Sequence, residues 1–291
     1  SIGDSAFSDC SGLTSITIPE GVTSIGEYAF YGCYGLTSIT IPERVTSIGK
    51  YAFSACIRLT SIEIPKSVIS IESGAFSNCS SLINITVEAD NIMYDSRDNC
   101  NAVIETETNT LILGCQNTII PKGVTSIGNG AFFQCLNLKS IIIPEGVTSI
   151  GESAFSACLH LKSIIIPESV TSIKPCAFYE CRDLTSIEIP KGVTDISHNV
   201  FSNCSSLTSV IIMEGVTCIG QAAFSDCSSL TSVEIPKSVT NIWNAAFVNC
   251  KNLTDIYYTG SKAQWDYIKL GDERFIYLCD HAWRVFYYTE D

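Results

Sequence analysis

Fifteen cysteines give this 291-residue chain its clearest capacity for chemistry, because thiols can form disulfides, hold metals or act as nucleophiles. Ten of them stand three residues after a phenylalanine, at Cys10, Cys33, Cys56, Cys79, Cys135, Cys158, Cys181, Cys204, Cys227 and Cys250. No C-x-x-C pair is present, so the spacing does not indicate a metal site. Neighbouring column cysteines are close enough for disulfides on distance alone. A uniform column gives no basis for selective pairing, however, and we predict reduced thiols that fill a core.

The remaining five cysteines lie outside this column. Cys100 and Cys115 flank an irregular segment, and the sequence leaves a disulfide or two free thiols as alternatives for them. Cys176, Cys218 and Cys279 show no arrangement that indicates a role.

The histidines and carboxylates do not form a recognisable catalytic set. His160 and His198 fall at different points of a 23-residue repeat, and His281 lies outside it, so no Ser-His-Asp, Cys-His or metal arrangement is indicated. Glutamates such as Glu145 and Glu168 follow prolines and alternate with lysines along the repeat, as in a solvated ladder of charges. We predict no catalytic residue, no metal and no cofactor, and therefore a protein that is not an enzyme.

The cysteine column is one part of this 23-residue repeat. Phenylalanine marks each copy, at Phe7, Phe30, Phe53, Phe76, Phe132, Phe155, Phe178, Phe201, Phe224 and Phe247. Isoleucine precedes each phenylalanine by five residues, and leucine follows each column cysteine by three. A fixed period of about 20 to 50 residues indicates a repeat array in which stacked units share one core.

Each unit contains two extended segments and a turn. Ile16 and Ile18 alternate with Ser15 and Thr17, which predicts a strand with one buried face, and Pro19 ends it. A second, shorter strand follows, and then a 3₁₀ or helical turn that carries the phenylalanine inward. Eleven first strands are predicted to form one parallel sheet, centred on residues 16–18, 39–41, 62–64, 85–87, 118–120, 141–143, 164–166, 187–189, 210–212, 233–235 and 256–258.

The repeated pattern L-T-S-I-x-I-P-x-x-V-T-S-I-G-x-x-A-F-x-x-C resembles the BspA-like, or Treponema-type, leucine-rich repeats over nearly the whole chain. The resemblance implies a leucine-rich repeat solenoid and a mainly β protein, a curved right-handed coil. Because strands space the coils more tightly than the bulky turns opposite, we expect the parallel sheet on the concave face. The resemblance also implies a surface or secreted protein of bacteria or some protists, linked to adhesion and host-protein binding, with no shared catalytic residues.

We predict two regions, an array over residues 1–259 and a capping segment over 260–291. The array contains a 33-residue unit at about 85–117 with a β-hairpin, which is either a tolerated insertion or a protruding binding loop. Ser261 and Gln264 fit a capping box for a short helix, and a strand is expected over 284–288. The first residues align with the middle of a unit, from which we expect a trimmed piece of a longer precursor.

Composition excludes several classes of protein. The chain is 46% hydrophobic and only 16% charged, so it is not disordered. Its apolar runs are a few residues long, whereas a membrane-spanning helix needs about 20. A net charge of −13 argues against nucleic-acid binding.

The best candidate site is the outward-facing position between the two buried isoleucines of each first strand, because it varies while the inward positions do not. Ile119, Ile142 and Ile165 occupy it in successive coils and predict an exposed apolar strip, with Lys139 and Lys162 beside it. The alternative is that isoleucine is simply a good strand residue. The other members of the predicted site are Thr17, Thr40, Glu63, Glu188, Ile211, Glu234 and Tyr257.

The sequence therefore predicts a non-enzymatic, extracellular or cell-surface solenoid that binds a host or neighbouring-cell protein, extracellular-matrix proteins included, on its concave sheet. It is expected to act as a monomer, without nucleic acid and without a transmembrane segment in this chain. The alternatives are a passive surface spacer and a glycan-binding module that uses the C-terminal aromatic residues.

Overall fold

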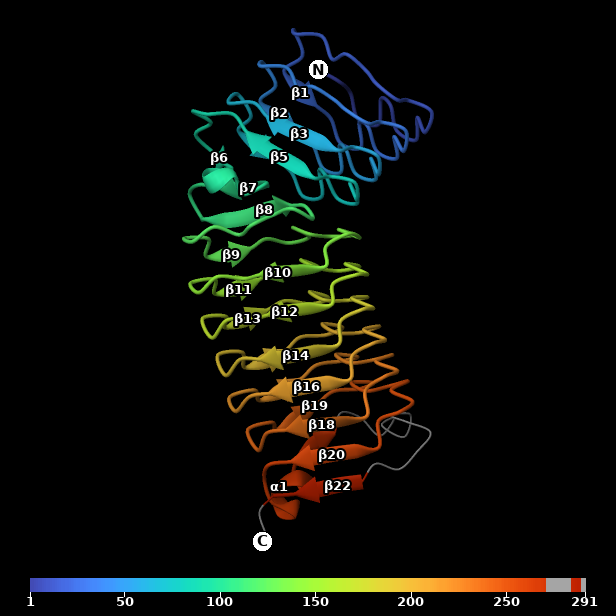
Figure 1. The fold of residues 1–291 in the computed structure, drawn as a ribbon, viewed down its shortest axis with the longest axis vertical. Coiled ribbons are helices and arrows are strands. Elements are labelled where there is room, and N and C mark those ends of the chain that lie inside the picture. The colour runs from blue at the N-terminus through green and yellow to red at the C-terminus, as the bar shows by residue number, and fades with distance from the viewer. Residues whose placement is uncertain (271–283, 289–291) are drawn as a thin grey trace. The chain divides into compact units, whose positions relative to one another are not determined.

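A computed structural model describes residues 1–270 and 284–288, so Cys279 and His281 lie outside the described residues. The chain is a β-solenoid of about ten turns with parallel strands and very little helix, as predicted. It divides into two compact units, Ser1–Leu138 (unit 1) and Lys139–Asp291 (unit 2). Figure 1 shows the strands of each unit stacked as successive rungs.

Each regular coil carries a first strand of up to four residues and a second strand of two. In β14 (Ser186–Ile189) the side chains of Ile187 and Ile189 are buried and that of Glu188 is exposed, which is the predicted alternation. The strand pairs in parallel with β16 (Ser209–Ile212), and each residue lies beside its equivalent 23 positions later. The 23-residue period of the repeat therefore sets the register of the sheet.

The first strands form three parallel ladders. In unit 1 they are β3 (Ser61–Ile64) and β5 (Asn84–Val87). In unit 2 they are β10 (Ser140–Ile142) with β12 (Ser163–Ile165), and β14 with β16, β18 (Ser232–Ile235), β20 (Asp255–Tyr258) and β22 (Arg284–Tyr287).

The second strands are short and line another face of each coil. In unit 1 they are β1 (Ser24–Ile25), β2 (Ser47–Ile48), β4 (Ser70–Ile71) and β9 (Ser126–Ile127). In unit 2 they are β11 (Ser149–Ile150), β13 (Ser172–Ile173), β15 (Asp195–Ile196), β17 (Cys218–Ile219), β19 (Asn241–Ile242) and β21 (Lys269–Leu270).

The prediction of one sheet with eleven first strands is wrong in detail. Residues 16–18, 39–41 and 118–120 form no regular strand. Ser38–Glu43 line one side of a surface hollow whose other side includes residues of β3 and β5. Residues 118–120 follow the irregular unit, and the N–H of Ile119 donates to Cys100 instead of to a neighbouring first strand.

Stacked phenylalanine rings form the centre of the core. In unit 1 the rings of Phe7, Phe30, Phe53 and Phe76 lie 5.1–5.2 Å apart and within 7° of parallel. In unit 2 the rings from Phe155 to Phe247 stack at 5.3–5.4 Å. Each coil thus buries its ring against the rings of its neighbours, which no single coil could do.

The turn that carries each phenylalanine takes the form of consecutive i→i+3 turns rather than a continuous 3₁₀ helix. In the coil of Phe30, the residues Tyr28 and Gly32 have φ values of 54° and 67°, which interrupt any helix. These two residues and Phe30 direct their N–H groups to the carbonyl oxygens of the next coil, at distances of 2.7–2.9 Å. The turn is therefore held by its neighbour as much as by its own hydrogen bonds.

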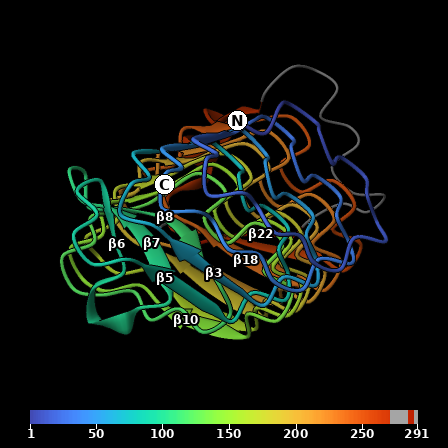
Figure 2. The same ribbon diagram turned by 90° about the horizontal axis from the view of Figure 1, so that it is seen from above.

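An irregular unit interrupts the array in unit 1. It contains β6 (Tyr94–Asp95), the 3₁₀ turn η1 (Arg97–Asn99), β7 (Ala102–Glu105) and β8 (Thr110–Gly114). β7 and β8 form the antiparallel hairpin that the two apolar runs indicated, with a bulge between Val103 and Ile104. Figure 2 shows β6 and β7 beside β5. β8 then pairs in parallel with β9 and restores the coil.

The C-terminal region begins with the short helix α1 (Lys262–Asp266). Its capping box is confirmed: Ser261 accepts a hydrogen bond from the Gln264 N–H, and the Gln264 side chain accepts one from the Ser261 N–H. The predicted strand over 284–288 is also present as β22, which pairs with β20.

Candidate functional site

The outward-facing positions of the first strands lie together on one face of each unit, which we call the first-strand face. In unit 1, Thr17, Thr40, Glu63 and Ile119 are all exposed. A hollow of about 450 Å³ on this face is lined by the carboxylates of Glu20, Glu43, Glu63 and Glu88.

One lysine forms ion pairs with two of these carboxylates. The Lys66 ammonium lies 3.7 Å from Glu43 and 3.4 Å from Glu88. Hydrogen bonding to Glu88 raises the pKa of Lys66, and the backbone N–H of Lys66 lowers the pKa of Glu88. Both groups thus stay charged over the physiological pH range, and this part of the face stays acidic.

The first-strand face of unit 2 combines isoleucine with acid. Ile142 and Ile165 are 78% and 73% exposed and lie directly beside each other across β10 and β12, with exposed Lys139 and Lys162 nearby. A hollow of about 380 Å³ is lined by Ile165 together with Glu145, Glu168 and Glu188. The pairing also aligns Glu188, Ile211, Glu234 and Tyr257 in one row across β14, β16, β18 and β20.

C-terminal aromatic residues, which the sequence analysis gave as an alternative glycan-binding site, extend this row, although their alignment with Tyr257 was not predicted. The ring of Tyr257 stacks on Phe286 at 5.1 Å, and Tyr288 lies 6.4 Å from Tyr257. Phe286 and Tyr288 remain 42% and 62% exposed. Trp265, another aromatic residue of the C-terminal region, packs edge-on against the buried Tyr258 instead.

The column cysteines are buried structural thiols, as predicted, except for Cys10 in the first coil, which is exposed. All fourteen cysteines among the described residues are free, Cys100 and Cys115 included, so the disulfide alternative is not realised. In at least seven coils the thiol donates to the carbonyl oxygen of the phenylalanine in the preceding coil, as in Cys56 to Phe30 at 3.3 Å. Burial raises the pKa of Cys79 and Cys204 to about 12, which makes them poor nucleophiles at neutral pH.

One histidine pairs with an acidic side chain. His160 contacts Asp183 at 3.0 Å, and both side chains are exposed. Within residues 1–270 and 284–288, no group of three or more His, Cys, Asp or Glu residues could hold a metal ion. In the same residues, no helix is long and apolar enough to cross a bilayer.

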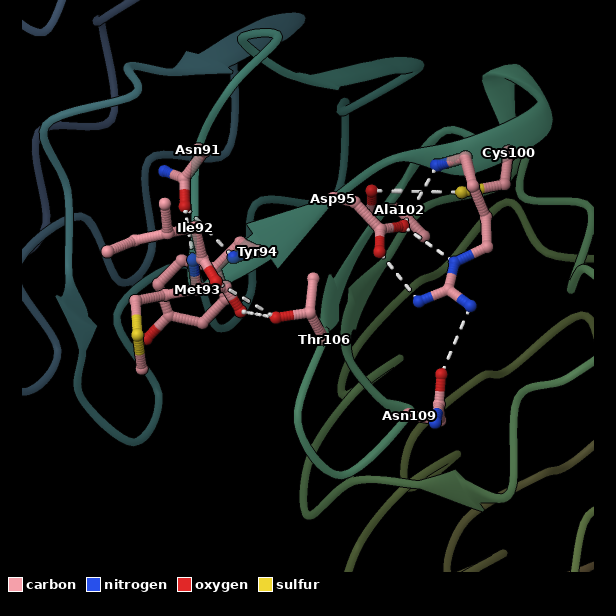
Figure 3. Close-up of polar contacts among 10 residues, drawn as sticks. Asn91, Ile92, Met93, Tyr94, Asp95, Cys100, Ala102, Thr106 and Asn109 are labelled. Carbon is pink, nitrogen blue, oxygen red and sulfur yellow. Dashed lines mark hydrogen bonds and ion pairs between the residues drawn. The ribbon is translucent and has the colours of Figure 1, made fainter.

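The irregular unit is packed against the array by a polar network (Figure 3). The Asn91 amide donates to the carbonyls of Pro65 and Val68 in the preceding coil and accepts from the N–H groups of Met93 and Tyr94. The Thr106 hydroxyl contacts the Met93 carbonyl at 3.1 Å, which joins β7 to the segment before β6.

A second part of the network joins η1 to the tip of the hairpin. The Arg97 guanidinium forms two hydrogen bonds to Asp95, at 2.8 and 2.6 Å, and a third to the Asn109 side chain at 3.1 Å. The hydrogen bond to Asp95 raises the pKa of Arg97. The repeat pattern gave no signal for these contacts, because all three residues lie where the pattern is lost.

Comparison with known proteins identifies related repeat proteins. The family model described as BspA type leucine rich repeat region matches residues 1–102, 112–192 and 171–267. A leucine rich cell surface protein of Faecalibacterium prausnitzii A2-165 is 36% identical, with a TM-score of 0.69, over 91% of this chain and 65% of that protein. The chain thus spans 65% of that protein's length.

Two other solved structures share the fold. A leucine-rich repeat protein of Bacteroides ovatus is 26% identical over 98% of this chain and 81% of its own, with a TM-score of 0.58. The pneumococcal vaccine antigen PcpA is 19% identical over 91% of this chain and 71% of its own, with a TM-score of 0.62. No curated protein matches the chain.

Proposed function

Because the chain belongs to the BspA-type leucine-rich repeat family, we propose that it is a non-enzymatic module that binds a partner protein at a cell surface or after secretion. The partner is a protein of a host or of a neighbouring cell, extracellular-matrix proteins included. It engages the first-strand face, where the variable residues of the repeat are gathered. The description of the F. prausnitzii relative as a cell surface protein supports this location.

The adjacent pair Ile142 and Ile165 is the observation that carries the proposal. Both side chains are about three-quarters exposed, whereas the inward isoleucines of the same strands, Ile141 and Ile164, are each 6% exposed. Burying such a side chain contributes about 1.5–3 kcal/mol, so a partner that covers both gains substantially. The carboxylates around them supply the polar rim that protein interfaces usually have.

We expect the double variant Ile142→Glu/Ile165→Glu to bind its partner at least about 100-fold more weakly, because two charges replace the centre of the apolar contact. Binding to a panel of immobilised extracellular-matrix proteins, measured by surface plasmon resonance, tests this. Both positions are exposed, so the urea midpoint should stay unchanged.

A matched control keeps the number and type of substitutions the same. Ile69 and Ile92 are 52% and 76% exposed and lie away from the first strands. Ile69→Glu/Ile92→Glu should leave binding intact. Equal binding by both double variants would refute the assignment of the face, and no binding by the unmodified chain to any protein would favour the passive spacer.

The cluster of Tyr257, Phe286 and Tyr288 supports a second candidate function, the binding of a glycan against exposed aromatic rings. On a glycan array, Phe286→Ala should then lose the binding signal. Trp265→Ala alters a packed side chain and should lose the signal only if the capping segment unfolds. Retention of every glycan signal by Phe286→Ala would exclude this candidate.

A further inference from the structure

In most coils of the array, three backbone hydrogen bonds join the phenylalanine turn to the coil that follows. In the coil of Phe53, the N–H groups of Tyr51, Phe53 and Ala55 donate to carbonyl oxygens of the next coil at 3.3, 2.7 and 2.8 Å. The same three bonds recur in unit 2, for example from the turn that contains Phe201. They are a regular element of the repeat.

These bonds are missing after the turn of Phe76. Within the part of the chain that the structure describes, the equivalent N–H groups of Gly74, Phe76 and Asn78 have no hydrogen-bond acceptor. The cause is the irregular unit, in which the hairpin replaces the phenylalanine turn. Folded proteins pair more than about 90% of their buried backbone N–H groups, so the donor of the buried Phe76 needs a partner. Gly74 and Asn78 are partly exposed, which leaves their donors open to a partner from outside.

In two nearby places, another group replaces a hydrogen-bond partner that the irregular unit removes. The N–H of Ile71, at the end of β4, would also face a missing strand, but it donates to the hydroxyl of the buried Tyr94 at 3.0 Å. Further along, the N–H of Gly114 takes the place of the missing phenylalanine N–H and donates to Ala131 at 2.8 Å. The three donors of the Phe76 turn have no such substitute among the described residues.

The Phe76 turn borders a crevice, which we call the missing-turn crevice, and Gly74 and Phe76 are part of its lining. Its volume is about 220 Å³, several times the roughly 30 Å³ that one water occupies in the liquid. Phe76, Ile112 and Leu113 give it apolar walls, and the charged residues in its lining are Glu72 and Glu105.

We propose that the missing-turn crevice binds a short peptide segment of a partner protein. Carbonyl oxygens at alternate residues of that segment accept the hydrogen bonds of Gly74, Phe76 and Asn78, so that the peptide replaces the absent turn. Glu72 and Glu105 repel anions and favour a lysine or arginine on the segment. Recognition through free backbone donors resembles the addition of a strand to a sheet edge, and it is independent of the first-strand face.

Amide hydrogen exchange followed by NMR on the full chain tests the proposal. In the free protein, the amides of Gly74, Phe76 and Asn78 should exchange at least about 100-fold faster than those of Tyr51, Phe53 and Ala55, which are hydrogen bonded.

The probe is the acetylated and amidated peptide KYAFSA, residues 50–55 of this chain, whose carbonyls already accept the hydrogen bonds of such a turn. At about 5 mM, above the ~1 mM Kd of a weak complex, it should slow the three amides at least about threefold and leave the reference amides unchanged.

Two variants separate specific binding from general protection. Ser77→Tyr fills the crevice and should remove the effect of the peptide, whereas Ser8→Tyr, at the equivalent position of the first coil, should retain it. Glu105→Lys should weaken binding of the basic peptide without filling the crevice. It replaces Ser77→Tyr as the test variant if Ser77→Tyr unfolds the coil, which would show as lost protection at the reference amides. The proposal would be overturned if the peptide did not change exchange at the three amides, or if it slowed them equally in the Glu105→Lys variant. Either result would mean that the crevice holds water rather than a peptide.

Discussion

Raising the pH from 8 to about 11 is expected to remove about 8 kcal/mol of stability through three buried thiols alone, and so to unfold the solenoid. Burial raises the pKa of Cys79, Cys135 and Cys204 to about 12 in the folded protein, against 9.0 for an unperturbed thiol. Above pH 9 the unfolded chain therefore binds fewer protons than the folded one, and the free energy of unfolding falls with rising pH. The slope is about 1.4 kcal/mol per pH unit for each thiol, or about 4 for the three.

Urea titrations at pH 8, 9, 10 and 11 measure this dependence. Stability should be independent of these thiols below about pH 8 and should decline between about pH 9 and 12. Typical domains are stable by only about 5–15 kcal/mol, so a loss of this size is visible as unfolding without denaturant. The triple variant Cys79→Ala/Cys135→Ala/Cys204→Ala is less stable at pH 8 but should show a slope shallower by about 4 kcal/mol per pH unit. An identical slope in both proteins would contradict the assignment.

Replacing Phe178 by alanine is expected to lower the free energy of unfolding by about 3–5 kcal/mol. The ring is fully buried and stacks on Phe155 and Phe201, at 5.3 Å on each side. Its loss leaves a cavity inside a ladder whose neighbouring coils are held in register by their backbones and cannot close around it. Each lost aromatic pair adds about 0.5–1.5 kcal/mol to the loss from burial.

Hydrogen exchange at the amides of unit 2, followed across a urea titration, measures that effect. Ile142→Ala is the control, because it removes a large apolar side chain that is 78% exposed and should change stability by no more than about 0.5 kcal/mol. A loss of less than about 1 kcal/mol in the free energy of unfolding of Phe178→Ala would mean that the stacked rings contribute little to the stability of the core.

The regular period of the repeat made most of the fold predictable. Wherever the period holds, like residues stack, and the inward isoleucines, the phenylalanine ladder and the cysteine column follow from it. The hairpin of β7 and β8 could also be predicted, because two short apolar runs on either side of the polar residues 105–110 indicate two strands. Ile142 and Ile165 could be assigned to one exposed face because strand alternation fixes which side chains point outward.

The remaining features depend on more than the period of the repeat. Phe286 joins the row of Tyr257 although their separation along the chain is not a multiple of the repeat, and no spacing rule reveals that alignment. The unpaired donors of Gly74, Phe76 and Asn78 depend on which turn is absent beyond them, a property of a neighbour rather than of their own sequence. The weak first strands at 16–18 and 39–41 carry good strand sequences, so propensity alone could not show that their ladder would not close.

The left-handed residues in the turns have a consequence for cooperativity. Tyr51 and Ala55 hold φ values of 53° and 62°, which cost a residue with a side chain about 1–2 kcal/mol each, and their N–H groups bond to the next coil. A coil on its own is therefore strained, and most of the folding free energy resides in the coupling between adjacent coils, as in a one-dimensional chain of interacting units. Where three of those couplings are absent, after Phe76, side chains join the coils instead. Asn91 bonds to the carbonyls of Pro65 and Val68, and the Tyr94 hydroxyl accepts from the Ile71 N–H, so the coupling across this boundary depends on the identity of a few side chains rather than on the repeated backbone.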